Sequence, residues 1–378
     1  MKSQTLDLTC KLIKKASITP DDAGCQSLLA ARLRLSRFRI EQMRFGSVDN
    51  LWARYGDEGP VLVMLGHTDV VPPGPLDAWS SPPFEPNIRG DWLYGRGAAD
   101  MKGGVAAMVT ACERFIKKCP RPAGSLALLL TSDEEGPAIH GIREVIRVLQ
   151  ERNESIDWCL VGEPSSRDRL GDVMRIGRRG SLSGHITVQG IQGHIAYPHL
   201  ARNPVHDLAR LIGELSARTW DEGHPPFPPT SFQVSNIKGG TGAENLIPGQ
   251  ADAHFNFRYS PAHSRDSLVE AVESTCLDLG IESKIEWRLS GEPFISQPGA
   301  LTRALREAAS SILGIDPKGD TGGGTSDGRF IAPTGAEVVE FGPINASIHQ
   351  IDERVGIEDL DRLSEVYESV IERLLWPR

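Results

Sequence analysis

The chain has 378 residues, which is more than one hydrophobic core usually serves, so we expect two domains. Hydrophobic residues make up 39% of the sequence and charged residues 24%, as in an ordinary globular protein. The formal net charge of -9 argues against a nucleic-acid-binding role, because binding phosphates requires a basic surface.

Targeting segments and disulfide bonds are not expected either. The N-terminal residues Met1–Leu8 lack the apolar core of a signal peptide, and no apolar run approaches the length of a membrane span. The six cysteines are scattered without a CxxC pair, which is typical of free thiols in a reducing compartment. We therefore expect a cytoplasmic protein with no membrane contact, in which histidines and carboxylates bind any metal.

The first half of the sequence alternates between strand and helix patterns. This alternation predicts an α/β domain with a mixed, mostly parallel sheet flanked by helices. The predicted elements are helix Gln26–Phe38, strand Val61–Leu65, helix Gly104–Lys118, strand Ser125–Thr131, helix Ile139–Gln150 and strand Trp158–Val161.

From about Gly180 the pattern changes to β-α-β-β-α-β, which is the order of a ferredoxin-like α+β domain. We expect residues 180–292 to form this inserted domain, between a first part (1–179) and a second part (293–378) of the α/β domain. In the inserted domain, the predicted elements are strand Ser181–Gln189, helix Pro204–Ala217, strands Ser231–Lys238 and Ala251–Tyr259, helix Leu268–Leu279 and strand Lys284–Leu289. In the second part of the α/β domain, they are helix Leu301–Leu313, strand Glu337–Phe341 and helix Ile357–Leu375.

A histidine lies directly after the first apolar strand, in Gly66-His67-Thr68-Asp69. Ligands of open α/β sheets bind at the carboxyl ends of strands, so the imidazole of His67 is well placed to bind a metal. Asp69 can then orient the ring through its other nitrogen. The alternative is a strand-end histidine capped by a local aspartate, and the other strand ends decide between the two.

Acidic residues follow the other predicted strands. Asp133-Glu134-Glu135 and Glu163 each follow a strand, Asp100 lies in a glycine-rich turn, and His349 follows a later strand after a loop. Single carboxylates at strand ends usually cap helices or face solvent, but so many at one sheet edge require a cation. Two histidines and three carboxylates suit zinc or a similar divalent ion, with one carboxylate bridging a pair. Glu134 would remain free as the general base.

The sequence around these residues resembles the zinc aminoacylase/carboxypeptidase superfamily. The resemblance rests on the order and spacing of His67–Pro72, Gly95–Gly104, Asp133–Gly136 and Gly162–Pro164, and it covers nearly the whole chain. Within the superfamily, the chain is most similar to the branch that hydrolyses the succinyl amide of a diamino dicarboxylic acid. The stretches that favour this branch are Arg178–Gly184, Gln192–His199, Gly322–Arg329 and Phe341–Gln350.

The resemblance implies a fold, a cofactor and a set of roles. Two zinc ions per subunit are expected, for which cobalt can substitute: His67, Asp100 and Glu163 would bind one ion, and Asp100, Glu135 and His349 the other. Asp69 would orient His67, and Glu134 would be the general base. The inserted domain would be the lid and dimerisation surface of a homodimer, in which His194 enters the active site of the second subunit and stabilises the oxyanion.

The resemblance also implies a small-molecule substrate with several carboxylates. Arginine pairs bidentately with a carboxylate, which suits Arg178 and Arg258. Taken alone, Arg258 would be interpreted as a solvated strand residue and His194 as a surface histidine. His140 is expected on the surface. The positions implied to bind substrate are Arg178, Ser181, Asn245, Arg258, Gly324, Thr325 and Asn345.

Three other functions share some of these sequence features. A related deacylase, such as an acetylornithine deacetylase, or a metallo-dipeptidase would differ only in its substrate. A serine hydrolase is suggested by Gly324–Gly328, which matches G-x-S-x-G, but turn-forming residues precede it where a nucleophile elbow needs a strand. A non-catalytic binding protein would be expected to lack Glu134 or a metal ligand, and all are present.

Overall fold

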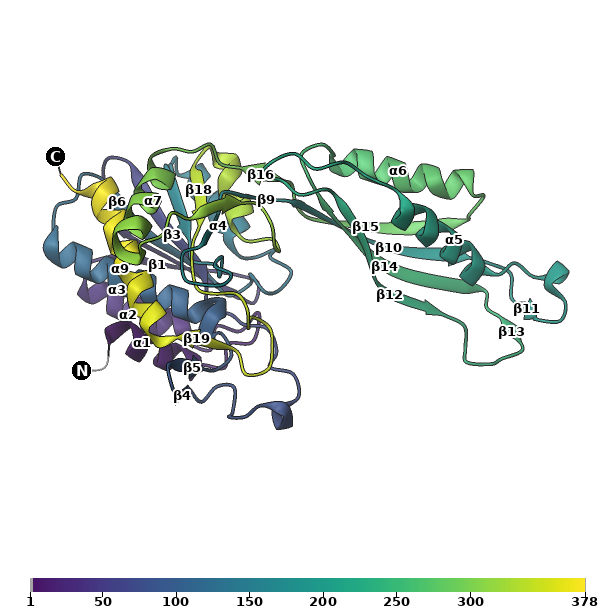
Figure 1. Cartoon of the computed structure of the whole chain (residues 1–378), viewed down its shortest axis with the longest axis horizontal. Helices are drawn as coiled ribbons and strands as arrows, with labels where there is room; N and C mark the ends of the chain where they lie inside the picture. The colour runs from purple at the N-terminus through teal and green to yellow at the C-terminus, as the bar shows by residue number, and fades with distance from the viewer. Residues whose placement is uncertain (1–2, 378) are drawn as a thin grey trace. The chain divides into compact units, whose positions relative to one another are not determined.

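The computed structural model describes residues 3–377, which divide into two compact units (Figure 1). Unit 1 comprises the described residues up to Gly177, the segment Ile295–Asp320 and the described residues from Ser326 onward. Unit 2 comprises Arg178–Phe294 and the short segment Thr321–Thr325. The chain therefore leaves unit 1 to build unit 2 and then returns.

Unit 1 contains an eight-stranded mixed sheet in the order β1-β2-β6-β3-β7-β18-β8-β17. β3 pairs in parallel with β6 and β7, and β18 pairs in parallel with β7, whereas β1 and β2 form an antiparallel hairpin beside β6. The α/β class and the mixed sheet are thus confirmed. The strands are β1 (Arg39–Phe45), β2 (Val48–Tyr55), β3 (Val61–His67), β6 (Ser125–Thr131), β7 (Trp158–Val161), β8 (Val173–Arg175), β17 (Lys318–Asp320) and β18 (Glu337–Glu340).

Helices pack against this sheet because its central strands are apolar along their length. All seven residues of β3 and of β6 are buried, as expected for strands covered on both faces. Leu62 and Met64 of β3 share a core with side chains from α2, α3, α7 and α9. The helices are α1 (Gln4–Ile13), α2 (Cys25–Leu35), α3 (Gly103–Lys118), α4 (Ile142–Glu151), α7 (Ala300–Leu313), α8 (Gly328–Ile331) and α9 (Ile357–Leu375), with helical turns at Leu76–Ala78, Ala98–Lys102 and Ala332–Thr334.

Several features of unit 1 differ from the sequence prediction. Helix α1 and the β1–β2 hairpin were not predicted. Helix α2 ends at Leu35 because Arg37 adopts a left-handed conformation, with φ at 64°. Helix α4 begins at Ile142 instead of Ile139 because the carboxylate of Asp133 accepts the backbone N–H groups of Ile139 and His140, at 2.9 and 3.2 Å.

Unit 2 has the predicted ferredoxin-like order, with a four-stranded antiparallel sheet arranged β12-β14-β10-β15. Alternate residues of β14, such as Phe255 and Phe257, pack in a core with leucines of α5 and α6. The residues that alternate with these, such as Asn256 and Arg258, lie on the other face of the sheet. The elements are β10 (Gly180–Gln189), α5 (Pro204–Ala217), β12 (Ser231–Gly239), β14 (Gln250–Tyr259), α6 (Arg265–Asp278) and β15 (Ser283–Gly291).

Short strands and one turn complete the described chain. None of the helices in residues 3–377 combines the length and the apolar character needed to cross a membrane. The short elements are β4 (Asn87–Arg89), β5 (Trp92–Tyr94), β9 (Gly177–Arg178), β11 (Gly193–His194), β13 (Leu246–Ile247), β16 (Phe294–Ile295), β19 (Arg354–Gly356) and the turn Pro198–Leu200.

Candidate metal centre and active site

Three parallel strands of unit 1 end at one edge of the sheet, and a predicted site residue follows or ends each of them. β3 ends at His67, β6 leads into Asp133-Glu134-Glu135, and β7 leads to Glu163. The parallel register pairs His67 with Thr131, and Leu65 with Val161, so the three turns lie side by side. The sheet therefore gathers these side chains at its carboxyl edge.

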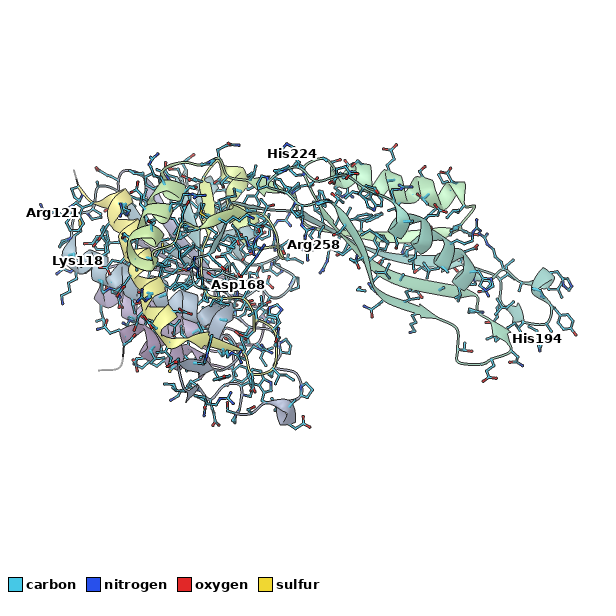
Figure 2. All side chains as sticks on the ribbon, viewed as in Figure 1. Lys118, Arg121, Asp168, His194, His224 and Arg258 are labelled. Carbon is cyan, nitrogen blue, oxygen red and sulfur yellow. The ribbon has the colours of Figure 1, made fainter. Side chains whose placement is uncertain are left out.

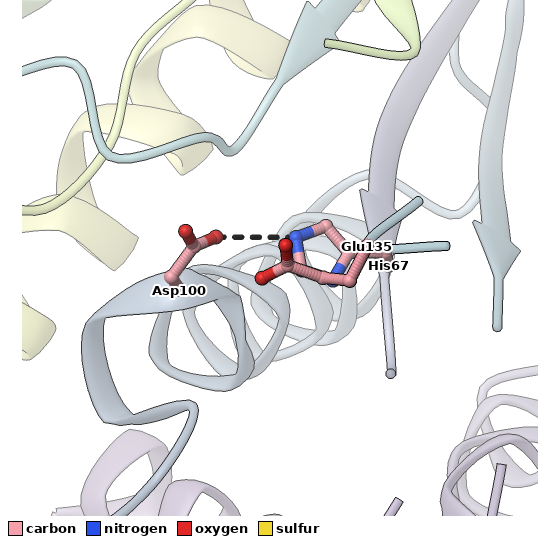
Figure 3. Close-up of side chains that lie close together, drawn as sticks. All are labelled: His67, Asp100 and Glu135. Atoms are coloured by element: carbon pink, nitrogen blue, oxygen red, sulfur yellow. Dashed lines mark hydrogen bonds and ion pairs between the residues drawn. The ribbon is translucent and has the colours of Figure 1, made fainter. Parts of the chain in front are cut away.

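Asp100 lies between two histidines at this edge. Its Oδ1 is 3.2 Å from Nε2 of His67, and its Oδ2 is 3.3 Å from Nε2 of His349. An oxygen of Glu163 lies 3.6 Å from the same nitrogen of His67, and an oxygen of Glu135 lies 3.0 Å from that of His349. Figure 3 shows how His67, Asp100 and Glu135 converge. The five side chains form two histidine–carboxylate sets that share Asp100.

The donor atoms are spaced closely enough to bind metal ions. Ligand atoms of His67, Asp100 and Glu135 all lie within 4.8 Å of one another, and so do those of His67, Glu134 and Glu163. Imidazole nitrogens and carboxylate oxygens together are typical ligands of Zn²⁺ and similar divalent ions. Glu134, which the sequence assigned as the base, thus borders the same space as the metal ligands.

The electrostatics of the cluster also fit a cation. Burial lowers the pKa of His67, but its hydrogen bond to Asp100 and the negative charge of Glu163 raise that pKa well above the usual value. Burial raises the pKa of Glu134 well above its usual value, and the charge of Glu163 raises it further. Carboxylates packed this closely need protons or cations to neutralise them. Divalent cations therefore suit the residues present.

Asp69 connects two parts of the site. Its backbone carbonyl oxygen lies 2.9 Å from Nδ1 of His67, whereas its carboxylate lies 3.7 Å from that nitrogen. The carboxylate accepts the backbone N–H groups of Glu135 at 3.1 Å and of Glu134 at 3.4 Å. The main chain of Asp69 thus faces the imidazole, and its side chain fixes the turn that carries Glu134 and Glu135.

Two buried carboxylates beside the cluster were not predicted. Glu353 is fully buried and accepts the backbone N–H of Asp100 at 3.0 Å. Asp327 is also buried, which raises its pKa to about 6, and its charge contributes to the raised pKa of Glu134. Asp327 lies within the stretch Gly322–Arg329 that carried the family resemblance and Glu353 lies shortly after the stretch Phe341–Gln350, but the sequence holds no signal of their burial.

Six of the seven predicted substrate-binding residues belong to unit 2. Ser181 on β10 pairs directly with Arg258 on β14. Arg178 is buried, and its Nη1 donates to the carbonyl oxygens of Gly322 at 3.1 Å and Gly324 at 3.2 Å. The guanidinium therefore holds the turn that carries Gly324 and Thr325. Gly323 is needed in this turn, because its φ is +88° and a Cβ there would lie 2.7 Å from Nη1 of Arg178.

The remaining predicted residues are His194 and Asn245 in unit 2 and Asn345 in unit 1. His194 on β11 is exposed, and its Nδ1 accepts the N–H of Ala196 at 3.1 Å. The carbonyl oxygen of Asn245 accepts the N–H of Ile195, so Asn245 lies close to His194. Figure 2 shows His194 and Arg258 at opposite ends of unit 2. Asn345 belongs to unit 1, so within one unit the structure does not gather the whole predicted substrate set.

The G-x-S-x-G match is not a nucleophile elbow. Ser326 is fully buried, and its Oγ donates to the buried carboxylate of Glu340. The residues directly before it, Thr321–Thr325, form no strand, whereas the motif requires a strand, a turn and a helix in succession. The structure thus contradicts a serine hydrolase, and His140 is exposed as expected.

The sequence matches a family model and full-length relatives. The model described as peptidase family M20/M25/M40 matches residues 63–373. A protein from Alkalilimnicola ehrlichii named succinyl-diaminopimelate desuccinylase is 57% identical over 373 residues, which cover 99% of this chain and 100% of that protein. The similarity to this relative therefore extends over both units.

Solved structures of the same family have a similar fold. An M20 family metallo-carboxypeptidase from Sulfolobus solfataricus superposes with a TM-score of 0.86 at 18% identity, covering 98% of this chain and 99% of that one. A Bacillus subtilis protein described as a dinuclear metal-binding peptidase of the M20 family superposes with a TM-score of 0.73 at 15% identity, covering 98% and 97%. The resemblance found in the motifs is confirmed by the family match, the relative and the fold: the chain belongs to peptidase family M20/M25/M40.

Proposed function

We propose that the protein is a metal-dependent amide hydrolase that cleaves N-succinyl-LL-2,6-diaminopimelate to succinate and LL-2,6-diaminopimelate, a step of lysine and diaminopimelate biosynthesis. The observation that carries the hydrolase is the Asp100 carboxylate, whose two oxygens face His67 and His349 at 3.2 and 3.3 Å. The full-length relative named succinyl-diaminopimelate desuccinylase supports the substrate.

Two divalent cations fit the proposed centre, with Zn²⁺ as the expected ion and Co²⁺ as a substitute. His67, Asp100 and Glu163 would bind one cation, and Asp100, Glu135 and His349 the other. When bound, such a pair acidifies a water molecule and polarises the amide carbonyl. Asp100 is suited to the bridging position because its two oxygens face different histidines.

Glu134 is the proposed general base. Its carboxylate borders the same space as His67 and Glu163, where an attacking water would lie. It would accept a proton from that water and return it to the departing amine nitrogen. Asp69 supports it by fixing the backbone N–H of Glu134 and Glu135.

The substrate carries several carboxylates, so its pocket needs cationic groups. Arg258 lies opposite Ser181 in the sheet of unit 2, and we expect its guanidinium to bind a substrate carboxylate bidentately. Arg178 supports the turn of Gly324 and Thr325 and offers a second guanidinium. Asn245 and Asn345 would supply further hydrogen bonds.

Unit 2 is the proposed lid and dimerisation surface of a cytoplasmic homodimer. β12 forms one edge of its sheet, and Ile237 on that strand is 63% exposed. Ile195, Tyr197 and Leu200, close to His194 in sequence, are also exposed apolar residues. Unpaired edges and apolar surface of this kind favour association with another chain. In the homodimer, His194 would stabilise the oxyanion in the site of the second subunit.

An assay of three substrate classes tests this function. We expect hydrolysis of N-succinyl-LL-2,6-diaminopimelate with a kcat/KM at least about 100-fold above that for N-acetylornithine or a dipeptide. The reason is that the polar groups of the protein that would pair with the succinyl carboxylate find no such partner in the other two substrates. Chelation should abolish the activity, and Zn²⁺ or Co²⁺ should restore it. A preference for the acetyl or dipeptide substrate would contradict the proposed substrate, and activity that resists chelation would contradict the metal mechanism.

A further inference from the structure

Glu353 is the centre of a buried polar cluster next to Asp100. Its side chain is fully buried. Oε1 accepts the backbone N–H groups of Ala99 at 2.9 Å and Asp100 at 3.0 Å. Oε2 accepts the backbone N–H of Gly97 at 2.9 Å and a hydrogen bond from Nη1 of Arg96 at 2.8 Å. One carboxylate thus binds four donors that all come from the segment leading to Asp100.

Arg96 extends this cluster to the neighbouring loops. It is 2% exposed, and its Nη1 also donates to the carbonyl oxygen of Gln350 at 3.1 Å, in the residue after His349. Its Nη2 donates to the carbonyl oxygen of Pro72 at 3.4 Å, in the loop that follows His67. The Arg96–Glu353 pair therefore joins the loops that present His67, Asp100 and His349.

The backbone at Asp100 explains why such support is needed. Asp100 departs from helical geometry, with φ at -122° and ψ at 97°, in the middle of the turn Ala98–Lys102 that leads into α3. The first N–H groups of a helical segment have no acceptors within the helix. Glu353 supplies these acceptors, and its negative charge suits the positive end of the helix dipole. The orientation of Asp100 thus depends on a residue 253 positions later in the chain.

We propose that Glu353 is the positioning residue that holds Asp100 between His67 and His349, and that it thereby sets the affinity of the site for the second of two metal ions. This inference rests on the proposed two-metal function. Glu353 acts through the backbone of Asp100, because its own oxygens are occupied by Arg96 and by N–H groups. A small rotation of Asp100 would lengthen its contact with one of the two histidines. Asp100 would then no longer serve both metal positions, although His67 and His349 would keep their places.

Glu337 offers a matched control within the same unit. Its carboxylate also accepts four hydrogen bonds at the beginning of a helix, from the N–H groups of Gly299, Leu301 and Thr302 and from the hydroxyl of Thr302, at 2.7 to 2.9 Å. Glu337 begins β18 and pairs with Trp158 at the amino end of β7, at the edge of the sheet opposite the site. It therefore shares the chemistry of Glu353 without its position.

The substitutions Glu353→Gln and Glu337→Gln change each cluster in the same way. The amide oxygen can still accept two N–H groups, but the amide NH₂ faces the remaining donors. In E353Q, these donors are Arg96 and Gly97 or, if the amide is turned round, Ala99 and Asp100. Both variants should lower the melting temperature of the metal-free protein, and only E353Q should change the metal site.

Calorimetric titration of Zn²⁺ into the full-length, chelator-treated proteins tests the proposal. Wild type should bind two equivalents. E353Q should raise the Kd of one equivalent by about 10- to 100-fold, whereas E337Q should keep both values within about threefold of wild type. The absorption spectrum of the Co²⁺-loaded protein is a second readout, which should change in E353Q and not in E337Q. If E353Q does not fold, Arg96→Lys serves instead, because a single ammonium cannot reproduce all the guanidinium contacts.

The possible results separate the two proposals. If E353Q, or R96K in its place, binds both equivalents with wild-type affinity, the positioning role is overturned and the two-metal function stands. The same holds if E337Q weakens the second equivalent as much as E353Q does. If wild type binds fewer than two equivalents, the two-metal function is overturned, and the role of Glu353 with it.

Discussion

Nδ1 of His67 lies 2.9 Å from the backbone carbonyl oxygen of Asp69 and 3.7 Å from the carboxylate of that residue. The carbonyl can only accept, so it favours the tautomer of His67 that carries its proton on Nδ1. Nε2 can then give up its proton when a cation binds, and its lone pair becomes available as a ligand on the side that faces Asp100 and Glu163. The carboxylate of Asp69 is left to hold the turn of Glu134 and Glu135.

Asp69→Asn tests this division of roles. The variant retains the carbonyl oxygen that faces His67, but only one oxygen of its side chain can still accept an N–H group, and its NH₂ group faces the N–H of either Glu134 or Glu135. We expect kcat to fall by about 10- to 100-fold while the metal content is retained. Asp69→Ala, which loses the side-chain acceptors altogether, should lower kcat further and leave the fold intact by circular dichroism. Near-normal turnover in both variants would show that the side chain has no part in the site.

Glu134→Gln separates catalysis from binding. The variant keeps the size of the side chain but cannot accept a proton, so turnover should fall by a factor of about 10² to 10⁴. The metal content, measured by elemental analysis, should stay at the wild-type value. A non-catalytic binding protein would be indifferent to this change, and unaltered turnover would therefore contradict the role of Glu134.

Metal removal should destabilise the folded protein, because the proposed cations would neutralise the buried carboxylates of Asp100 and Glu163. Zn²⁺ at 100 times its Kd should raise the free energy of unfolding by about 2.7 kcal/mol per site, seen as a higher melting temperature in calorimetry. His194→Ala is the matched control, since His194 is exposed on unit 2 and should leave the stabilisation unchanged. Equal melting temperatures with and without Zn²⁺ would contradict the metal site.

The sequence predicted those parts of the fold whose residues form long apolar runs. β6, β7 and α9 have the predicted bounds, and β3 extends two residues beyond its predicted end, because both faces of these strands and one side of α9 are buried. The β1 segment Arg39–Phe45 was missed because four of its seven residues are charged or polar and only Met43 is buried. The positions of His67, Glu135 and Glu163 followed from the strands that precede them.

The support of the site could not be predicted in the same way. Glu353 and Asp100 are far apart in the chain, and no periodic pattern connects them. The use of the Asp69 carbonyl in place of its carboxylate depends on backbone geometry, which residue types alone do not determine. Sequence patterns thus indicated which side chains gather at the sheet edge, whereas the contacts that orient them required the folded chain.

Ser326→Ala tests the assignment of the G-x-S-x-G match as coincidental. The hydroxyl of Ser326 donates to the buried Glu340, so its loss should destabilise unit 1 by about 1–3 kcal/mol. A serine nucleophile would be essential, whereas here kcat should stay within about threefold of wild type, since a change in a buried support costs far less than the loss of a nucleophile. Serine-reactive phosphonates should also leave wild type active, and loss of activity in either experiment would restore the serine hydrolase.

Asp221 in unit 2 should make stability depend on pH. Its carboxylate accepts the N–H of Gly223 at 2.7 Å, the N–H of Thr230 at 3.2 Å and the hydroxyl of Ser260 at 3.1 Å. Burial raises the pKa of Asp221, but these hydrogen bonds outweigh burial and hold the pKa below the usual 3.8. A carboxyl group whose pKa is lower in the folded than in the unfolded state stabilises the folded protein. This contribution is complete at a pH above the unfolded pKa, and it is lost as the pH falls through the folded pKa.

Asp221→Asn should therefore lower the free energy of unfolding by about 1–3 kcal/mol at pH 7, and the difference from wild type should shrink as the pH falls from 4 to 2. Urea unfolding of both proteins across this range measures the effect. Asp278→Asn is the control, because Asp278 is exposed at the end of α6 and should change stability little at either pH. A difference for D221N that stays constant down to pH 2 would show that the charge of Asp221 is not what stabilises its loop.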